Sequence, residues 1–297
     1  MKVLDQLSWS PWYELRGASQ NPEIPHHKGG LYRIRERGSR ILYYIGQTGS
    51  SSRGLRGRMS NLQGAFKDHM PYRDPHTAAP ALWVQFHLGH ILEVSICVID
   101  SDTQWRKGLE AVAISCYRQD HQSSPIFNFG RMPLGYEMPS GNNSKLKASG
   151  KLSRGVKTAQ RLTCHMSGRS PLGGLDHIVT DSAWCGHCWT SWCSAEGINE
   201  LSNEAKGLYR IKAIDDESLL YIGEGKIKSR LKAHLDKINR PEDVQGQIFA
   251  RSELQFSWVY TGEWKEHKHQ RLELENDLIA AHLLSRGSVP AAQFLGS

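Results

Sequence analysis

GLYRIRERGSRILYYIGQTGSSSRGLRGRM, the stretch from Gly30 to Met59, organises the rest of the chain. Aliphatic and aromatic residues flank a polar, turn-prone sequence around Gly38, and this pattern predicts a β-hairpin. With the hairpin centred on Gly38, Tyr32 and Tyr44 lie directly opposite each other, so their phenols point from one face. A Gly- and Ser-rich bend follows, and we predict a helix over residues 55–67.

The same pattern occurs a second time, as GLYRIKAIDDESLLYIGEGKIKSRL from Gly207 to Leu231. GLYRI recurs with five identical residues and YIG recurs at the same interval, which indicates an internal duplication. Predicted strands at 92–99 and 254–260 and predicted helices at 109–118 and 272–284 extend the repeat. Each copy therefore belongs to the α+β class, with a small, mostly antiparallel sheet of about three strands flanked by helices.

The duplication divides the chain into four parts. A lead-in at residues 1–28 precedes the first copy at 29–132. A basic linker with a Cys- and Trp-rich segment, residues 133–205, then precedes the second copy at 206–297. We expect the lead-in to pack its aromatic residues on the first copy.

Composition favours a soluble, cytoplasmic protein. The mean hydropathy is −0.51 and the apolar runs are short, so we expect no membrane span. The first twelve residues lack the apolar core of a secretory signal. Six cysteines in 297 residues do not make a disulfide framework, which favours a reducing compartment.

The net charge of +7 favours a polyanionic partner. Residues 131–170 hold eight basic residues against one acid, Glu137, so this segment carries as much net charge as the whole chain. It is either a solvated linker or an arm that follows phosphates and orders on nucleic acid. The candidate DNA contacts are Arg53 and Arg56 near the hairpin and Lys145, Lys147, Lys151 and Arg154 in the basic segment.

G-L-Y followed about a dozen residues later by Y-I-G, and then by an arginine in the next helix, resembles the GIY-YIG nuclease family, twice over. The resemblance covers roughly two thirds of the chain. It implies two GIY-YIG units in tandem, each with one nuclease active site.

Hydrolysis of a phosphodiester needs an activated water, neutralisation of the phosphate charge and help for the leaving oxygen. The pKa of a phenol is about 10, so a tyrosine acts as a base only beside a cation that lowers this pKa. An arginine supplies positive charge and holds a phosphate with its planar fork. A single helix carboxylate suits one Mg²⁺ that keeps most of its waters.

The resemblance implies the site residues of each copy. In the first copy they are Tyr32, Tyr44, Arg58, Glu110 and Asn128, and in the second they are Tyr209, Tyr221, Arg230 and Glu275, with His234 as an addition. It implies that Glu110 and Glu275 bind Mg²⁺ or Mn²⁺. Tyr32 and Tyr209 are the expected bases or water-positioning groups, and the arginines are expected to stabilise the pentavalent phosphate.

Three positions leave alternatives open. The loop before Arg58 is longer than in the family, so Arg53 or Arg56 is an alternative to it. Gln293 replaces the family's asparagine, which weakens the expectation of activity in the second copy. Glu273 competes with Glu275, although Glu275 has the same interval to a following proline as Glu110. Packing tyrosines, solvated arginines and a helix-terminal Glu110 are the structural alternatives.

Cys185, Cys188 and Cys193, with Cys164 and His165 upstream, resemble half a zinc site. Only one C-x-x-C pair is present, so buried thiols beside the neighbouring tryptophans are the favoured alternative.

These features favour a divalent-metal-dependent DNA endonuclease whose two sites let a monomer cut both strands of duplex DNA, with a dimer left open. Restriction or anti-phage defence is the preferred setting, over repair and mobile-element functions. The alternative is a DNA-binding or repair-associated protein in which one or both copies no longer cut. The sequence does not define the recognition sequence, nor whether the substrate is DNA or RNA.

Overall fold

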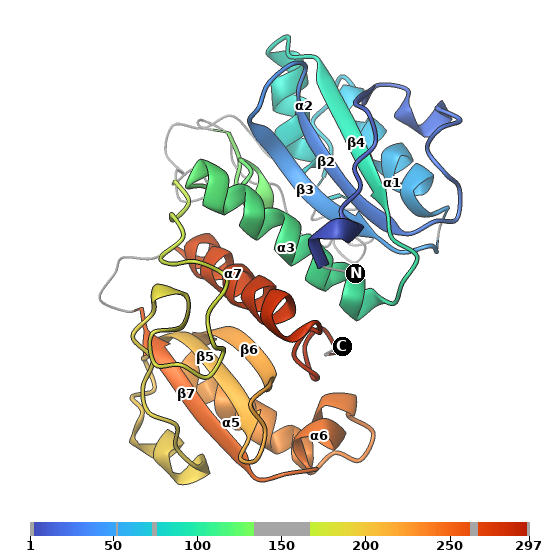
Figure 1. The fold of residues 1–297 in the computed structure, drawn as a ribbon. Helices are drawn as coiled ribbons and strands as arrows, with labels where there is room; N and C mark the ends of the chain where they lie inside the picture. The colour runs from blue at the N-terminus through green and yellow to red at the C-terminus, as the bar shows by residue number, and fades with distance from the viewer. Residues whose placement is uncertain (1–2, 52, 73–75, 134–166, 262–266, 296–297) are drawn as a thin grey trace, which may run out of the picture. The chain divides into compact units, whose positions relative to one another are not determined.

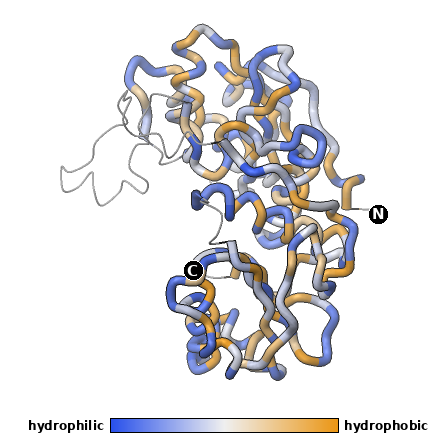
Figure 2. The backbone as a smooth tube through the Cα atoms, turned by 90° about the vertical axis from the view of Figure 1, so that its left-hand side faces the viewer, coloured by the Kyte–Doolittle hydropathy of each residue, from blue (hydrophilic) through white to orange (hydrophobic). Residues whose placement is uncertain are grey.

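The computed structural model describes residues 3–51, 53–72, 76–133, 167–261 and 267–295 (Figure 1). The chain divides by compactness into an N-terminal unit, Asp5–Asp102 with Ser124–Ser167, and a C-terminal unit, Met1–Leu4 with Thr103–Ser123 and Gly168–Ser297. Hydrophobic and hydrophilic residues interleave along the described part of the chain (Figure 2), and none of its helices is long and apolar enough to cross a membrane.

The N-terminal unit contains a four-stranded antiparallel sheet in the order β1-β4-β2-β3. Its strands are β1 (Tyr13–Glu14), β2 (Gly30–Glu36), β3 (Leu42–Thr48) and β4 (Leu92–Val98), and its helices are α1 (Gly54–Leu62) and α2 (Ala79–His87), with short 3₁₀ turns at Ala18–Gln20, Gln63–Phe66 and Asn128–Gly130. Leu55, Met59 and Leu82 from the helices are buried in one core with Tyr32 and Ile34. Helix α2 was not predicted.

The C-terminal unit contains a three-stranded antiparallel sheet in the order β6-β5-β7. Its strands are β5 (Lys206–Ala213), β6 (Leu219–Lys226) and β7 (Leu254–Tyr260), and its helices are α3 (Thr103–His121), α5 (Ile227–Ile238), α6 (Val244–Phe249) and α7 (Lys268–Arg286), with 3₁₀ turns at Trp184–Gly186 and Ala195–Glu200. The predicted α+β class with two antiparallel sheets is confirmed. A fourth strand, β1, is added to the first sheet by the lead-in.

The hairpin register differs from the prediction. Tyr32 pairs with Gly46, and Tyr44 pairs with Ile34, so the expectation that the two tyrosines lie directly opposite is wrong. The reason is a β-bulge after Ile34, which leaves Tyr43 as an extra residue on β3. The phenol of Tyr32 then lies over Gly46, where an added Cβ would meet its hydroxyl oxygen at 2.5 Å. Only glycine allows this approach.

The second hairpin repeats this geometry. Tyr209 pairs with Gly223 and Ile211 with Tyr221, and the bulge leaves Leu220 as the extra residue. An added Cβ at Gly223 would clash with the hydroxyl oxygen of Tyr209. The glycine of each YIG is therefore required by the tyrosine of the preceding strand.

The segment that follows the last helix of each copy, called the tail here, contains Phe127 in the first copy and Ala292 in the second and binds the bulge. Phe127 donates its backbone N–H to the carbonyl of Tyr43 at 2.8 Å, and Ala292 does the same to Leu220 at 2.8 Å. Because bulge residues fall outside the strand ladder, these carbonyls need another partner. The duplication therefore includes the irregular tail as well as the regular elements.

The duplication also extends further toward the N-terminus than predicted. Ser10 and Thr190 each donate a backbone N–H to a strand carbonyl, that of Ile96 at 2.8 Å and that of Trp258 at 3.0 Å. Each side-chain oxygen accepts the N–H of the same strand residue at 3.0 Å. The sequences around them, WSPW and WTSW, share a Trp-Ser/Thr-x-Trp pattern.

The tryptophans of this pattern stack on equivalent arginines. The guanidinium carbon of Arg33 lies 4.5 Å from the ring centroid of Trp9, and that of Arg210 lies 4.3 Å from that of Trp189. The expected packing of the lead-in on the first copy is thus confirmed. The Cys- and Trp-rich segment, which we placed outside both copies, packs on the second sheet in the same way.

We predict that Trp189→Ala lowers the free energy of unfolding by about 3–5 kcal/mol, the usual cost of removing a buried tryptophan side chain. Trp189 is buried and donates its ring N–H to the carbonyl of Trp184 at 3.0 Å. Denaturant titration provides the measurement, and Ile178→Ala, at a 68% exposed side chain of the same segment, is the control. Equal losses in the two variants would contradict the assignment of this segment to the fold.

Candidate active sites

The rings of the two motif tyrosines of the N-terminal unit stack diagonally across the hairpin. Their ring centroids are 6.0 Å apart, and the hydroxyl of Tyr44 lies 3.4 Å from that of Thr77. The hydroxyl of Tyr32 is 2.7 Å from Nε2 of His76. The side chain of Tyr32 is only 2% exposed, whereas Tyr44 is half-buried. The cluster is therefore open to solvent through Tyr44.

His76 is neutral and has a defined tautomer. Its Nδ1 accepts the backbone N–H of Ala78 at 3.1 Å, so the ring carries its proton on Nε2 and donates it to the oxygen of Tyr32. Burial, followed by the positive charge of Arg58, lowers the pKa of His76 to about 3.

The C-terminal unit contains the same three rings. The centroids of Tyr209 and Tyr221 are 6.1 Å apart, and the Tyr209 hydroxyl is 3.0 Å from Nε2 of His234. Burial, and after it the charges of Lys237 and Arg230, lowers the pKa of His234 to about 4, so this imidazole is also neutral. Tyr209 is 1% exposed and burial raises its pKa well above the usual value.

The two histidines come from different places in the repeat. His234 lies on α5, four residues after Arg230, whereas the residue four positions after Arg58 is Leu62. His76 instead comes from the loop before α2, in a stretch that we predicted only as a loop. Sequence reasoning missed it because no fixed spacing links it to the motif.

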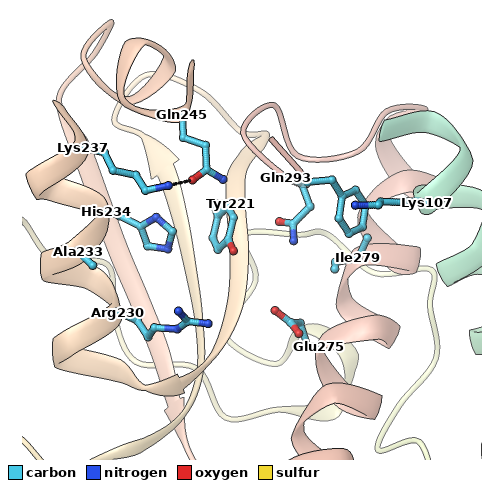
Figure 3. Close-up of a pocket in the computed structure, with 11 residues that line it drawn as sticks. Lys107, Tyr221, Arg230, Ala233, His234, Lys237, Gln245, Glu275, Ile279 and Gln293 are labelled. Atoms are coloured by element: carbon cyan, nitrogen blue, oxygen red, sulfur yellow. Dashed lines mark hydrogen bonds between the residues drawn. The ribbon is translucent and has the colours of Figure 1, made fainter. Parts of the chain in front are cut away.

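A pocket of about 430 Å³ opens beside Tyr221 in the C-terminal unit (Figure 3). Arg230 projects into it from α5 and Glu275 from α7, and the hydroxyl of Tyr221 points between them. Burial, followed by the charge of Glu224, raises the pKa of Glu275 to about 8. Burial also raises the pKa of Tyr221 to about 12, and the charge of Glu275 adds to this. The carboxyl and the phenol are thus held in their neutral forms.

Of the two candidate carboxylates on α7, only Glu275 lines the pocket. Glu273 is fully buried, accepts the backbone N–H of Arg169 at 2.6 Å and lies 3.7 Å from the guanidinium of Arg118. Glu275 is only partly buried and lines the pocket, so it is the one of the two that can reach a cation bound there.

The three arginines after the first hairpin have different environments. Arg56 donates to the backbone carbonyls of Ile24 at 2.8 Å and Asn21 at 3.0 Å, so its guanidinium holds the lead-in. Arg53 is exposed at the start of α1. Arg58 is half-buried and its charge acts on His76. Among the three, Arg58 is the one placed beside the tyrosine cluster.

Asn128 and Gln293 have the same structural role. The side chain of Asn128 accepts the N–H of Ile45 at 2.9 Å and donates to its carbonyl at 2.8 Å. Gln293 accepts the N–H of the equivalent residue, Ile222, at 3.0 Å. The replacement of Asn by Gln, which was expected to weaken the second copy, thus preserves this contact. Both side chains position the strand that carries the second tyrosine.

Several predicted residues are not placed in these clusters. Glu110 lies half-buried on α3, which belongs to the C-terminal unit, so its part in the first site stays a prediction. The basic residues Lys145, Lys147, Lys151 and Arg154 lie outside the described residues.

The cysteines that resemble half a zinc site have dissimilar surroundings. Cys185 is buried and burial raises its pKa, Cys188 is exposed, and the backbone of Cys193 pairs with that of Phe256. Among the residues that the structure describes, no three His, Cys, Asp or Glu side chains form a group that would hold a metal. Cys164 and His165 lie outside those residues.

Comparison of the chain with models of protein families, with curated proteins and with solved structures gives no match. The arguments for function come from the two clusters and the pocket.

We predict that Glu275→Gln removes a pH dependence of stability. The folded-state pKa of Glu275 is about 8, above the unfolded value of about 4.3. The stability that its protonated form contributes is fully present below the unfolded pKa and is lost as the pH rises through the folded pKa. As the pH rises from about 5 to about 8, the Tm of the wild type should therefore fall more than the Tm of the variant.

Thermal unfolding at several pH values measures this effect. Glu253→Gln, at an exposed carboxylate, should follow the wild type. Added Mg²⁺ at the upper pH should raise the Tm of the wild type and of Glu253→Gln but not that of Glu275→Gln. Parallel pH curves for all three proteins would show that Glu275 is not an ionisable group held neutral by its surroundings.

Proposed function

We propose that this chain is a divalent-metal-dependent DNA endonuclease that hydrolyses phosphodiester bonds at two sites, one in each copy. One observation carries the proposal. The same tyrosine–imidazole hydrogen bond occurs in both copies, although His76 and His234 come from unrelated positions. Core packing does not require that a buried hydrogen bond from the tyrosine be made again by a histidine of a different structural element. A catalytic role common to both copies does require it.

Two residues of the pocket support this proposal. Arg230 provides a planar cation for the non-bridging oxygens, and Glu275 is a carboxylate whose ionisation is opposed until positive charge arrives. Glu275 would hold Mg²⁺ or Mn²⁺, and the ion would supply positive charge to the site. Such charge would also lower the high pKa of the neighbouring Tyr221 toward the range in which a phenol accepts a proton.

The burial of the tyrosines revises their roles within this proposal. Tyr32 and Tyr209, the expected bases or water-positioning groups, are 2% and 1% exposed. Tyr221 lines the pocket and Tyr44 is half-buried in the first copy. We therefore assign contact with the attacking water to Tyr221 and Tyr44. Tyr32 and Tyr209 hold the neutral histidines and position the second tyrosine of each pair.

Cleavage of supercoiled plasmid with Mg²⁺ or Mn²⁺ tests the proposal. Tyr44→Phe and Tyr221→Phe should each slow one site by about 10²–10⁴-fold, the usual contribution of an acid or base. Each single variant then accumulates nicked circles, and the double variant leaves supercoiled DNA. Tyr260→Phe, at a tyrosine that is 53% exposed on β7, is the control and should linearise DNA like the wild type.

If both single variants linearise DNA at the wild-type rate, the two-site proposal is wrong. Restriction-like defence is the biological setting that the proposal favours, and comparing modified with unmodified DNA in the same assay addresses it.

A second prediction separates the two tyrosines of one site. In the Tyr44→Phe background, Tyr209→Phe should slow nicking by about tenfold, because one buried hydrogen bond to His234 is lost. Tyr221→Phe should cost far more, since it removes the hydroxyl that faces the pocket. Single-turnover nicking rates measure both, and a larger loss from Tyr209→Phe would return the role of base to Tyr209.

One observation favours a DNA-binding protein that does not cut. The raised pKa values of Tyr209 and Tyr221 make both phenols poor bases in the absence of a cation. Retardation of the plasmid without nicks, at every metal ion and pH tested, would support this alternative.

A further inference from the structure

We infer that Lys107, from a helix of the first copy, completes the second site as a phosphate-binding residue. The inference rests on the proposed function of that site and names the part of the substrate that it would hold. It concerns helix α3, which the duplication assigns to the first copy but which packs against α7 in the C-terminal unit.

Helix α3 is fixed to α7 by a buried polar cluster. The guanidinium of Arg118 binds the carboxylate of Asp277 at 2.9 Å, and the hydroxyl of Ser115 donates to the same carboxylate at 2.9 Å. Asn276 donates to the carbonyl of Ala111 at 3.1 Å. Since Arg118 and Asp277 are buried and Glu273 lies 3.7 Å from the same guanidinium, loss of Arg118 would leave buried carboxylates without their counter-charge. This cluster sets the position of α3 along α7.

The start of α3 is fixed to the tail that lines the pocket. The side chain of Gln104 donates to the carbonyl of Gln293 at 2.8 Å. Gly108 lies so close to Val289 that an added Cβ would clash with its side chain. The residue between them, Lys107, is therefore held at the rim of the pocket that contains Tyr221.

The ammonium of Lys107 faces this pocket from the opposite side to the cations of α5 (Figure 3). Its Nζ lies 5.3 Å from the ring centroid of Phe294. Among the described residues, no carboxylate lies within ion-pairing distance of it. Lys237, by contrast, is 3.5 Å from the carboxylate of Asp243. Lys107 is thus a cation of the pocket without a described carboxylate at ion-pairing distance, and Arg230 lies on the other side of the pocket.

Lys107 is not a feature of the repeat. Aligning Glu110 with Glu275 places Leu272 of α7 at the equivalent position, so the duplication does not explain a lysine there. Positive charge on both sides of Glu275 suits a chain of successive phosphates better than a single terminal phosphate. The geometry therefore points to a continuous nucleic-acid backbone as the substrate, with the scissile phosphate at Arg230 and a flanking phosphate at Lys107.

The test uses the full chain carrying Tyr44→Phe, so that nicking reports the second site. Lys107→Ala should raise KM about tenfold with little change in kcat, because a flanking phosphate is bound equally in the ground and transition states. It should also reduce the slope of log affinity against log salt by about 0.9, the effect of one lost phosphate contact. Lys107→Arg should retain most of the affinity, and Lys206→Ala, at an exposed lysine outside the pocket, is the control for loss of one charge.

Equal KM and equal salt slopes for Lys107→Ala and Lys206→Ala, with nicking that still depends on Tyr221, would overturn the inference and leave the proposed function standing. Absence of any Tyr221-dependent nicking would instead overturn the proposed function. The contribution of Lys107 to binding is then measured by fluorescence anisotropy with a short DNA duplex. Weaker binding by Lys107→Ala than by Lys206→Ala supports the contact, and equal binding refutes it.

Discussion

The hydrogen bonds between an amide side chain of the tail and the edge strand of each sheet determine where the second tyrosine lies. β3 and β6 are edge strands, and each contains a bulge that removes a carbonyl from the ladder. The tail satisfies that carbonyl through its backbone and binds the next isoleucine, Ile45 or Ile222, through Asn128 or Gln293. Because an unpaired edge is free to twist or slip, this second attachment holds the tyrosine beside its partner.

Much of the fold could be predicted from the sequence, because the duplication shows each pattern twice. The strand at 254–260 and the long helix around Glu275 have apolar spacing that only one secondary structure satisfies. The register was not predictable, since a bulge is an insertion in pairing and has no composition of its own. The Trp-Ser/Thr-x-Trp pattern was visible twice, but its meaning depends on strand residues far along the chain.

The candidate site was predictable only in part, for a related reason. Tyr221, Arg230 and Glu275 follow from motif and interval, and they line one pocket. His76 does not follow, because a loop can deliver a side chain to a site from any position in the sequence. The exposure of each tyrosine could not be predicted either, because the sequence pattern of a strand is the same for a buried and for a pocket-facing aromatic residue. Tyr209 is buried, whereas Tyr221 lines the pocket.

The packing of α3 on α7 has a consequence for how this chain can be divided. The stretch of sequence that was copied and the body that folds differ by one helix, because the last helix of one copy is built into the body that contains the other. A fragment cut at the boundary of the repeat would expose the acid of Asp277 without its guanidinium partner and leave one side of α7 bare. Neither copy is then an autonomous module that recombination can move elsewhere without loss of this helix packing.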